Sequence, residues 1–154
     1  MLEKLILQKE MMNSILYKSI FLIRFIPGFV FFLEGIQKFL YEDTLGVGRF
    51  IKIGIPHAEF WALFVGIVEI VFGVLLILGF KTRWSAVPLL IDMKVAFIYT
   101  KWPLLIEKGF LPMFHDYRTD FAMTLCLIFL IINGSGAFSL DYYFLKSKEK
   151  QKTK

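Results

Sequence analysis

The stretch FWALFVGIVEIVFGVLLILGF, residues 60–80, contains a single charged side chain, Glu69, close to its centre. An α-helix needs about 20 apolar residues to cross a hydrocarbon layer about 30 Å thick, and a helix in a soluble core is seldom apolar on every face. We therefore expect a transmembrane helix with Glu69 near mid-bilayer. A charge at that depth costs roughly 2.5 to 3.5 kcal/mol on insertion scales, so Glu69 should face other helices and find a partner.

The composition of the 154 residues also indicates an integral membrane protein. Hydrophobic residues make up 57% of the chain, and the mean hydropathy of +0.65 lies above the range of soluble domains. The net charge of +5 comes largely from residues 146–154, after the last apolar run. We interpret the basic residues 146–154 as a solvated end that follows the positive-inside rule, so the expected partner is the lipid bilayer and not nucleic acid.

Four apolar segments predict an all-α fold, an antiparallel four-helix bundle that passes several times through a membrane. The predicted spans are 14–40, 60–80, 84–100 and 121–138. They form one transmembrane domain over 1–142, followed by a basic tail over 143–154. Ten Lys and Arg residues lie on the side of the termini and five on the other side, which predicts both termini in the cytoplasm. No cleavage-like site follows the first segment, so we expect that helix to be retained.

Glycines at helical spacing predict how the spans meet. Gly28 and Gly35 share one face of the first span, and Gly66 and Gly73 flank Glu69 on one face of the second. Small residues let two helices approach closely, so we expect these two faces to pack together. Gly79 is suited to ending the second span before a short turn. Two further packing glycines, Gly134 and Gly136, end the fourth span.

Charged residues inside the spans form the candidate pocket. By helical rise, Arg24, Asp92 and Lys94 should lie roughly 10 to 15 Å from the cytoplasmic ends and Glu69 about 18 Å, so we predict that Arg24 pairs with Asp92, Glu69 or both. A second group nearer the outer face should comprise Glu34, Lys38, Asp120 and His115. Two interpretations stay open: a purely structural set of ion pairs, or a pocket or proton path for a small molecule such as a quinone or a sulfur compound.

Other kinds of chemistry have little support in the sequence. His57 and His115 lie in different loops without metal-ligand spacing, so no metal site is expected. The single cysteine, Cys126, excludes an intramolecular disulfide and a Cys-x-x-Cys pair. Any electron transfer must therefore use a partner or a bound cofactor.

These residues, in this order, resemble the DoxX family of small four-helix bacterial membrane proteins from Ser19 to Tyr142. The closing run Asn133-Gly-Ser-Gly-Ala-Phe-Ser-Leu-Asp141 is similar to the family's Gly-x-Gly-x-x-Ser-x-Asp ending. In the piece that runs from Asp92 to Ala96, Lys94 stands where the resemblance leads us to expect an apolar residue. Lys94 is therefore a second candidate partner for Asp92 or Glu69. The other matching pieces are Arg24, Glu34-Gly-Ile-Gln-Lys38, Gly66-Ile-Val-Glu69 with Gly73, Leu78-Gly-Phe-Lys-Thr-Arg83, Asp92-Met-Lys-Val-Ala96 and Arg118-Thr-Asp120.

The resemblance implies an accessory protein or subunit of a membrane redox system, linked to quinone or sulfur chemistry, with quinone as the cofactor candidate. If the chain is an enzyme, the resemblance implies an oxidoreductase subunit that works with a redox partner subunit, and a homo-oligomer is a further option. The alternative from a different class is a non-catalytic scaffold or assembly factor whose buried charges only stabilise the bundle. A small transporter is the third option, and it would need an oligomer to build a wide enough path.

Overall fold

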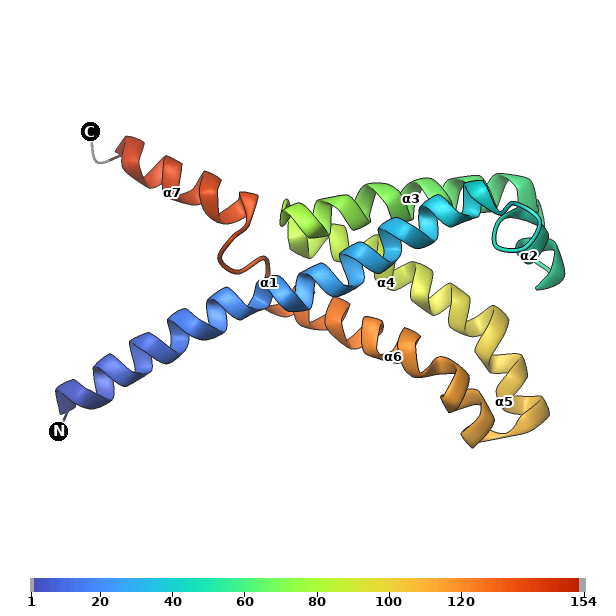
Figure 1. The fold of residues 1–154 in the computed structure, drawn as a ribbon, viewed down its shortest axis with the longest axis horizontal. Coiled ribbons are helices and arrows are strands. Elements are labelled where there is room, and N and C mark those ends of the chain that lie inside the picture. Colours follow the sequence, from blue (N-terminus) through green and yellow to red (C-terminus); the bar gives the residue numbers. More distant parts are fainter. Residues whose placement is uncertain (1, 153–154) are drawn as a thin grey trace.

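The computed structural model describes the backbone of residues 2–152, and the side chains of residue 15 and of residues 17–148. Within the described residues every regular element is helical, which confirms the all-α fold class (Figure 1). The helices are α1 (Leu2–Leu40), α2 (Val47–Lys52), α3 (Ala58–Leu78), α4 (Thr82–Ala96), the π-helical turn η1 (Phe97–Lys101), α5 (Trp102–Lys108), α6 (Phe110–Asn133) and α7 (Leu140–Lys152).

Two helical segments are long and apolar enough to cross a membrane, Tyr17–Leu40 in α1 and Ala58–Leu78 in α3. They correspond to the predicted spans 14–40 and 60–80. The predicted spans 84–100 and 121–138 lie within longer helical stretches, the first in α4 and η1 and the second mostly in α6. Gly79 adopts φ 67° after the last residue of α3, so the prediction that this glycine ends the helix is confirmed.

The chain between the predicted spans 84–100 and 121–138 is helical over most of its length. Residues 102–108 form α5, and α6 starts at Phe110. Pro103 lies in the first turn of α5, where a missing N–H costs nothing, and Gly109 separates the two helices with φ 83°. Proline and glycine therefore mark helix boundaries here and not an extended connection.

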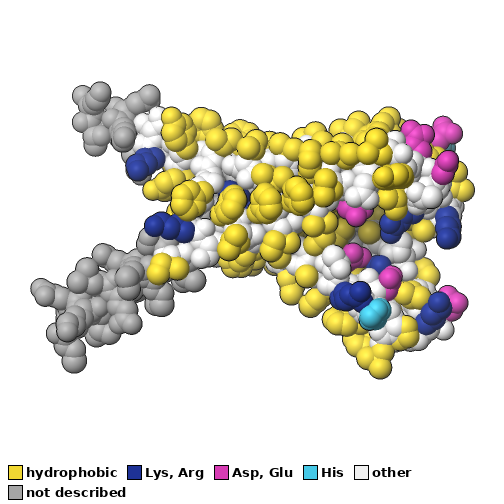
Figure 2. All heavy atoms as spheres, in the orientation of Figure 1, with side chains coloured by type: hydrophobic (Ala, Val, Ile, Leu, Met, Phe, Trp, Pro, Cys, Tyr) yellow, Lys and Arg dark blue, Asp and Glu magenta, His cyan; other side chains and the backbone are white. Residues whose placement is uncertain are grey.

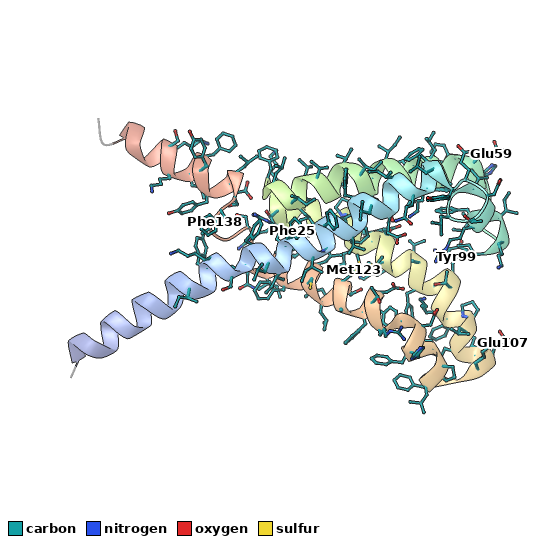
Figure 3. All side chains as sticks on the ribbon, in the orientation of Figure 1. Phe25, Glu59, Tyr99, Glu107, Met123 and Phe138 are labelled. Carbon is teal, nitrogen blue, oxygen red and sulfur yellow. The ribbon has the colours of Figure 1, made fainter. Side chains whose placement is uncertain are left out.

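Helices α1 and α3 make the most extensive contact, α4 packs on α6 and on α3, and α1 also contacts α6. Their shared core consists of aliphatic, methionine and phenylalanine side chains that are at most 9% exposed. The core residues are Ile20, Phe31, Leu76, Ala86, Leu89, Met123, Leu127 and Leu130. The labelled side chain of Met123 shows where α6 faces this core (Figure 3).

The outer surface of the long helices is hydrophobic. Figure 2 shows apolar side chains over the middle of the molecule and charged side chains gathered towards its ends. Large exposed residues such as Leu22, Leu63 and Ile91 are each more than half exposed. A soluble monomer rarely exposes so large an apolar surface, so this distribution fits helices surrounded by lipid.

Candidate functional site

The site begins with the close approach of α1 and α3. A Cβ atom at Gly35 would lie 2.7 Å from the Gly66 carbonyl oxygen, and one at Gly73 would lie 2.8 Å from the Gly28 carbonyl oxygen. Real Cβ atoms are almost never so close to another atom, so the two backbones approach this closely because Gly35 and Gly73 have no Cβ. As the residue numbers increase along α1 they decrease along α3, which places Glu69 between the two glycine contacts.

Glu69 forms an ion pair with Lys38 in this contact. The Lys38 Nζ atom lies 2.5 Å from Glu69 Oε2, and the two side chains are 11% and 4% exposed. Lys38 is in the last turn of α1, so its long side chain extends back along the helix to reach the carboxylate. A charge-assisted hydrogen bond of this kind is stronger than a neutral one, because little water competes for either group.

A cavity of about 210 Å³ lies beside this ion pair and is lined by residues of α1, α2, α3, α4, η1 and α6. Its charged lining contains four carboxyl groups and two cations. The Asp92 carboxyl, from α4, lines the same cavity as Glu69. Among the apolar and aromatic lining residues is Tyr99 of η1, which is labelled in Figure 3. The charged lining residues are Glu34, Lys38, Arg49, Glu69, Asp92 and Asp120.

Lys101 connects this lining to the surface. It is 7% exposed, and its Nζ atom lies 2.6 Å from Asp116 Oδ2, 3.2 Å from the Asp116 carbonyl oxygen and 3.5 Å from Asp120 Oδ2. The hydrogen bond and the charge of Lys101 lower the pKa of the exposed Asp116 carboxyl below its usual range. Lys101 is the last residue of η1, and π-helical turns occur often at functional sites.

The predicted pairing of Arg24 with Asp92 or Glu69 is wrong. Arg24 is fully buried, and its guanidinium donates hydrogen bonds to the carbonyl oxygens of Ser135, at 3.1 Å, and Phe138, at 2.9 Å. The reason is the register of α1 on α3. Gly28 lies against Gly73, so Arg24, one turn earlier, lies beside the end of α3, more than a full turn from Glu69. The depths of the charged residues, estimated from the helical rise, contain no information about this register.

The structure brings five of the seven candidate pocket residues to one cavity, namely Glu34, Lys38, Glu69, Asp92 and Asp120. They form one group, whereas the sequence suggested two. Lys94 is exposed, and it points away from the lining because it lies about half a turn from Asp92 on α4. His115 also lies outside the cavity and contacts Arg118, whose Nη1 is 2.7 Å from its ring Nε2.

The two glycines at the end of α6 shape the loop that holds Arg24. Gly134 and Gly136 have φ values of 82° and 67°, a region that favours glycine. A Cβ at Gly136 would lie 2.7 Å from the Tyr17 carbonyl oxygen, so this loop presses against α1. The Ala137 N–H donates a hydrogen bond to the same carbonyl, at 3.0 Å.

Sequence reasoning missed two cations of the site, Arg49 and Lys101. From the sequence, both residues entered only the count of Lys and Arg on the side opposite the termini, because both lie outside the predicted spans. Helix α2 places the exposed Arg49 in the cavity lining and η1 buries Lys101, and nothing in a single sequence marks either position. Within the described residues no three His, Cys, Asp or Glu side chains are grouped so as to hold a metal ion.

Chemically, the cavity offers hydrogen-bond donors and acceptors in one small space. Lys38 and Arg49 can donate to a carbonyl or other anionic oxygen, and the carboxyl groups can accept a proton or a hydroxyl hydrogen bond. Buried carboxyl and ammonium groups inside a membrane span are expensive and usually functional. The arrangement can therefore bind a small polar head and exchange protons with it.

Comparison with known proteins places the chain in a family. The DoxX family model matches residues 19–102. An uncharacterized membrane protein of Mycobacterium tuberculosis is 53% identical over 129 residues, which cover 80% of this chain and 79% of the relative. An uncharacterized protein of Haemophilus influenzae is 31% identical over 134 residues, 84% of this chain and 95% of the relative.

A third relative, from Bacillus subtilis, carries the name "Putative oxidoreductase CatD". It is 30% identical over 139 residues, which cover 90% of this chain and 96% of that protein. No solved structure matches the chain significantly. With a family model that covers more than half of its residues, a relative named as a membrane protein and long apolar helices, the chain belongs to the DoxX family and is a membrane protein.

Proposed function

We propose that the protein spans a bacterial inner membrane several times as an antiparallel four-helix bundle formed by α1, α3, the stretch from α4 to α5, and α6. Both ends of the chain lie at the same end of the molecule in Figure 1, as an even number of spans requires. Ten Lys and Arg residues belong to that side and five to the other, which supports a cytoplasmic position for both termini.

We propose that the protein acts in that membrane as an accessory protein or subunit of a quinone-linked redox system. The observation that carries the proposal is the cavity of about 210 Å³ at the Lys38–Glu69 ion pair. An apolar cavity of about 150 Å³ is large enough to hold benzene, so this space can accommodate one substituted ring. Such a ring would be the polar head of a quinone, with its isoprenoid tail left in the lipid.

The lining fits a quinone head in its chemistry as well as its size. Lys38 and Arg49 would donate hydrogen bonds to the ring carbonyl oxygens, and Phe31, Phe50 and Tyr99 supply the aromatic and apolar wall. A bound quinone would supply two-electron, two-proton redox chemistry. The chain's own part would be to orient the ring and to hold or release protons at the carboxyl groups beside it.

Electrons would pass to or from a partner subunit in this proposal. The chain has one cysteine, Cys126, so it cannot form a dithiol redox pair within itself. The printed name of the Bacillus subtilis relative, which contains the word oxidoreductase, supports a redox role without naming a substrate.

The second candidate function is a non-catalytic scaffold or assembly factor. The glycine contacts between α1 and α3 favour it, because the Lys38–Glu69 pair bridges the same two helices and would fix their register in the absence of any ligand. The two functions differ in what happens when one carboxylate loses its charge.

Glu69→Gln distinguishes them. In this variant the Lys38 ammonium group still shares the cavity lining with the carboxyl groups of Glu34 and Asp92. The variant should therefore have nearly the same melting temperature in detergent as the native protein. If the cavity binds quinone, a short-chain ubiquinone or menaquinone analogue should raise the melting temperature of the native protein and not that of the variant. Lys94→Gln, which changes an exposed charge on α4, is the matched control and should respond like the native chain.

An equal loss of melting temperature and ligand response in Glu69→Gln would support the scaffold instead. Native protein that shows no quinone-dependent stabilisation, and that carries no quinone in its lipid extract after purification, would refute the quinone site.

A further inference from the structure

A second cleft lies at the end of the molecule that carries both termini. It has a volume of about 620 Å³ and lies between the turn from α3 to α4, the loop after α6 and the start of α7. It is separate from the cavity at Glu69, and the two share no lining residue. Three cations line it, Lys81, Arg83 and Lys148, and all three are exposed.

The acidic residue in the cleft lining, Asp141, is already engaged. Its Oδ1 accepts a hydrogen bond from the Lys81 N–H at 2.8 Å, and its Oδ2 accepts one from the Thr82 N–H at 3.2 Å. Asp141 therefore caps the start of α4 and neutralises the positive end of that helix. The charges of the three cations remain available to a ligand.

The positions of these cations are set by the surrounding fold. Arg83 donates a hydrogen bond to the Ile132 carbonyl oxygen at 3.1 Å, which holds its guanidinium against the end of α6. Lys81 lies in the short turn, with Nζ 5.8 Å from the centre of the Phe80 ring. Lys148 comes from α7, whose start is fixed through Asp141. Two separate segments, the start of α4 and α7, thus direct positive charge to one cleft.

Aromatic side chains line the same cleft. Trp84 is 77% exposed and Phe144 is 48% exposed, and Tyr17 of α1 completes this part of the lining. Exposed tryptophan and tyrosine beside lysine and arginine, at the end of apolar helices, are typical of the boundary between lipid tails and headgroups. On the face shown in Figure 2, acidic side chains gather at the opposite end of the molecule.

We propose that this cleft binds the headgroup of an anionic phospholipid. The phosphate would lie among Arg83, Lys81 and Lys148, and the acyl chains would follow the apolar surface beside Trp84. The cleft combines cations with an apolar, membrane-level wall, which suits a lipid better than a soluble anion. The inference does not depend on the quinone proposal, because neither the residues nor the ligand are shared.

Native mass spectrometry of the full chain, in detergent supplemented with phosphatidylglycerol or phosphatidylcholine, tests the proposal. Each Lys or Arg near a membrane surface contributes a factor of about five in affinity for anionic lipid, so three contribute roughly 100-fold. The native protein should retain one phosphatidylglycerol in preference to phosphatidylcholine. The triple variant K81Q/R83Q/K148Q should lose that preference.

The matched control is K52Q/K94Q/K108Q, which removes three exposed cations outside the cleft and gives the same net charge. It should keep the preference for phosphatidylglycerol. Lys148→Gln alone, on the exposed face of α7, should reduce the preference about fivefold, so the proposal stays testable even if the triple variant folds poorly.

Equal phosphatidylglycerol retention by the triple variant and the control would overturn the proposal. The same holds if millimolar inorganic phosphate displaces the lipid completely from the native protein, because the cleft would then be a site for soluble anions.

Discussion

Replacing Lys38 with methionine should leave the Glu69 carboxylate buried without its ammonium partner. The two side chains are 11% and 4% exposed, so water cannot replace the lost charge. Breaking a buried pair by removing one partner costs about 3–5 kcal/mol. Proton uptake by the carboxylate limits that cost, because protonating a glutamate with the ordinary pKa of about 4.3 at pH 7 takes about 3.7 kcal/mol. We therefore expect a loss of about 3–4 kcal/mol at pH 7.

The same reasoning predicts how the loss responds to pH and to a second substitution. At pH 5 the cost of protonating an ordinary glutamate falls to about 1 kcal/mol, so the effect of Lys38→Met should shrink by more than half. Adding Glu69→Gln removes the unpaired charge, and the double variant should recover at least half of the lost stability. Unfolding by sodium dodecyl sulfate in mixed micelles, followed by far-ultraviolet circular dichroism, measures each value.

Lys94→Gln serves as the control in this experiment, because Lys94 is exposed and should contribute less than about 0.5 kcal/mol. A loss below about 1 kcal/mol for Lys38→Met at pH 7 would refute the reasoning. So would a double variant in which the two losses simply add, since independent effects would mean that the two groups do not interact.

Gly35→Leu should force α1 away from α3, because a Cβ there would lie 2.7 Å from the Gly66 carbonyl oxygen; a loss of about 1–3 kcal/mol is expected in the same micelle unfolding assay. Asp116→Asn should be less stable than the native chain at neutral pH, by under about 1 kcal/mol because the Asp116 side chain is 60% exposed. Lys101 lowers the pKa of Asp116, so the stability it contributes is present above the ordinary pKa of about 3.9 and is lost as the pH falls through the lower native pKa; unfolding curves of the two proteins should converge in acid. Asp141→Asn should weaken both hydrogen bonds at the start of α4, cost about 1 kcal/mol and accelerate tryptic cleavage in α7, which gel electrophoresis can follow.

The long helices could be predicted because their signal is local. The apolar run 60–80 and the glycine after it contain the information that starts and ends α3, and helical spacing brings Gly66 and Gly73 onto one face. Helix boundaries near Pro103 and Gly109 could not be separated from a loop, because both residues occur in turns as well as at helix ends. The length of α6 before Phe121 was missed for the same reason.

The acidic residues of the candidate site could be predicted from the sequence. The cations that pair with them could not. Charged residues such as Glu69 and Asp92 are conspicuous within apolar runs. The choice of Lys38 over Arg24 as the partner of Glu69 depends on the register of two helices, and periodicity places residues on a face without giving that register. Lys101 is buried because a π-helical turn redirects it, and that turn has no signature in the sequence.

The cap that Asp141 provides for α4 has a consequence for the order of synthesis. The carboxylate lies 60 residues after the Lys81 N–H that it binds, so the ribosome completes α4, α5 and α6 before the cap exists. The start of α4 is therefore made before the carboxylate that binds it. A chain that ends before residue 141 would contain α1 to α6 and would lack both hydrogen bonds that hold the start of α4.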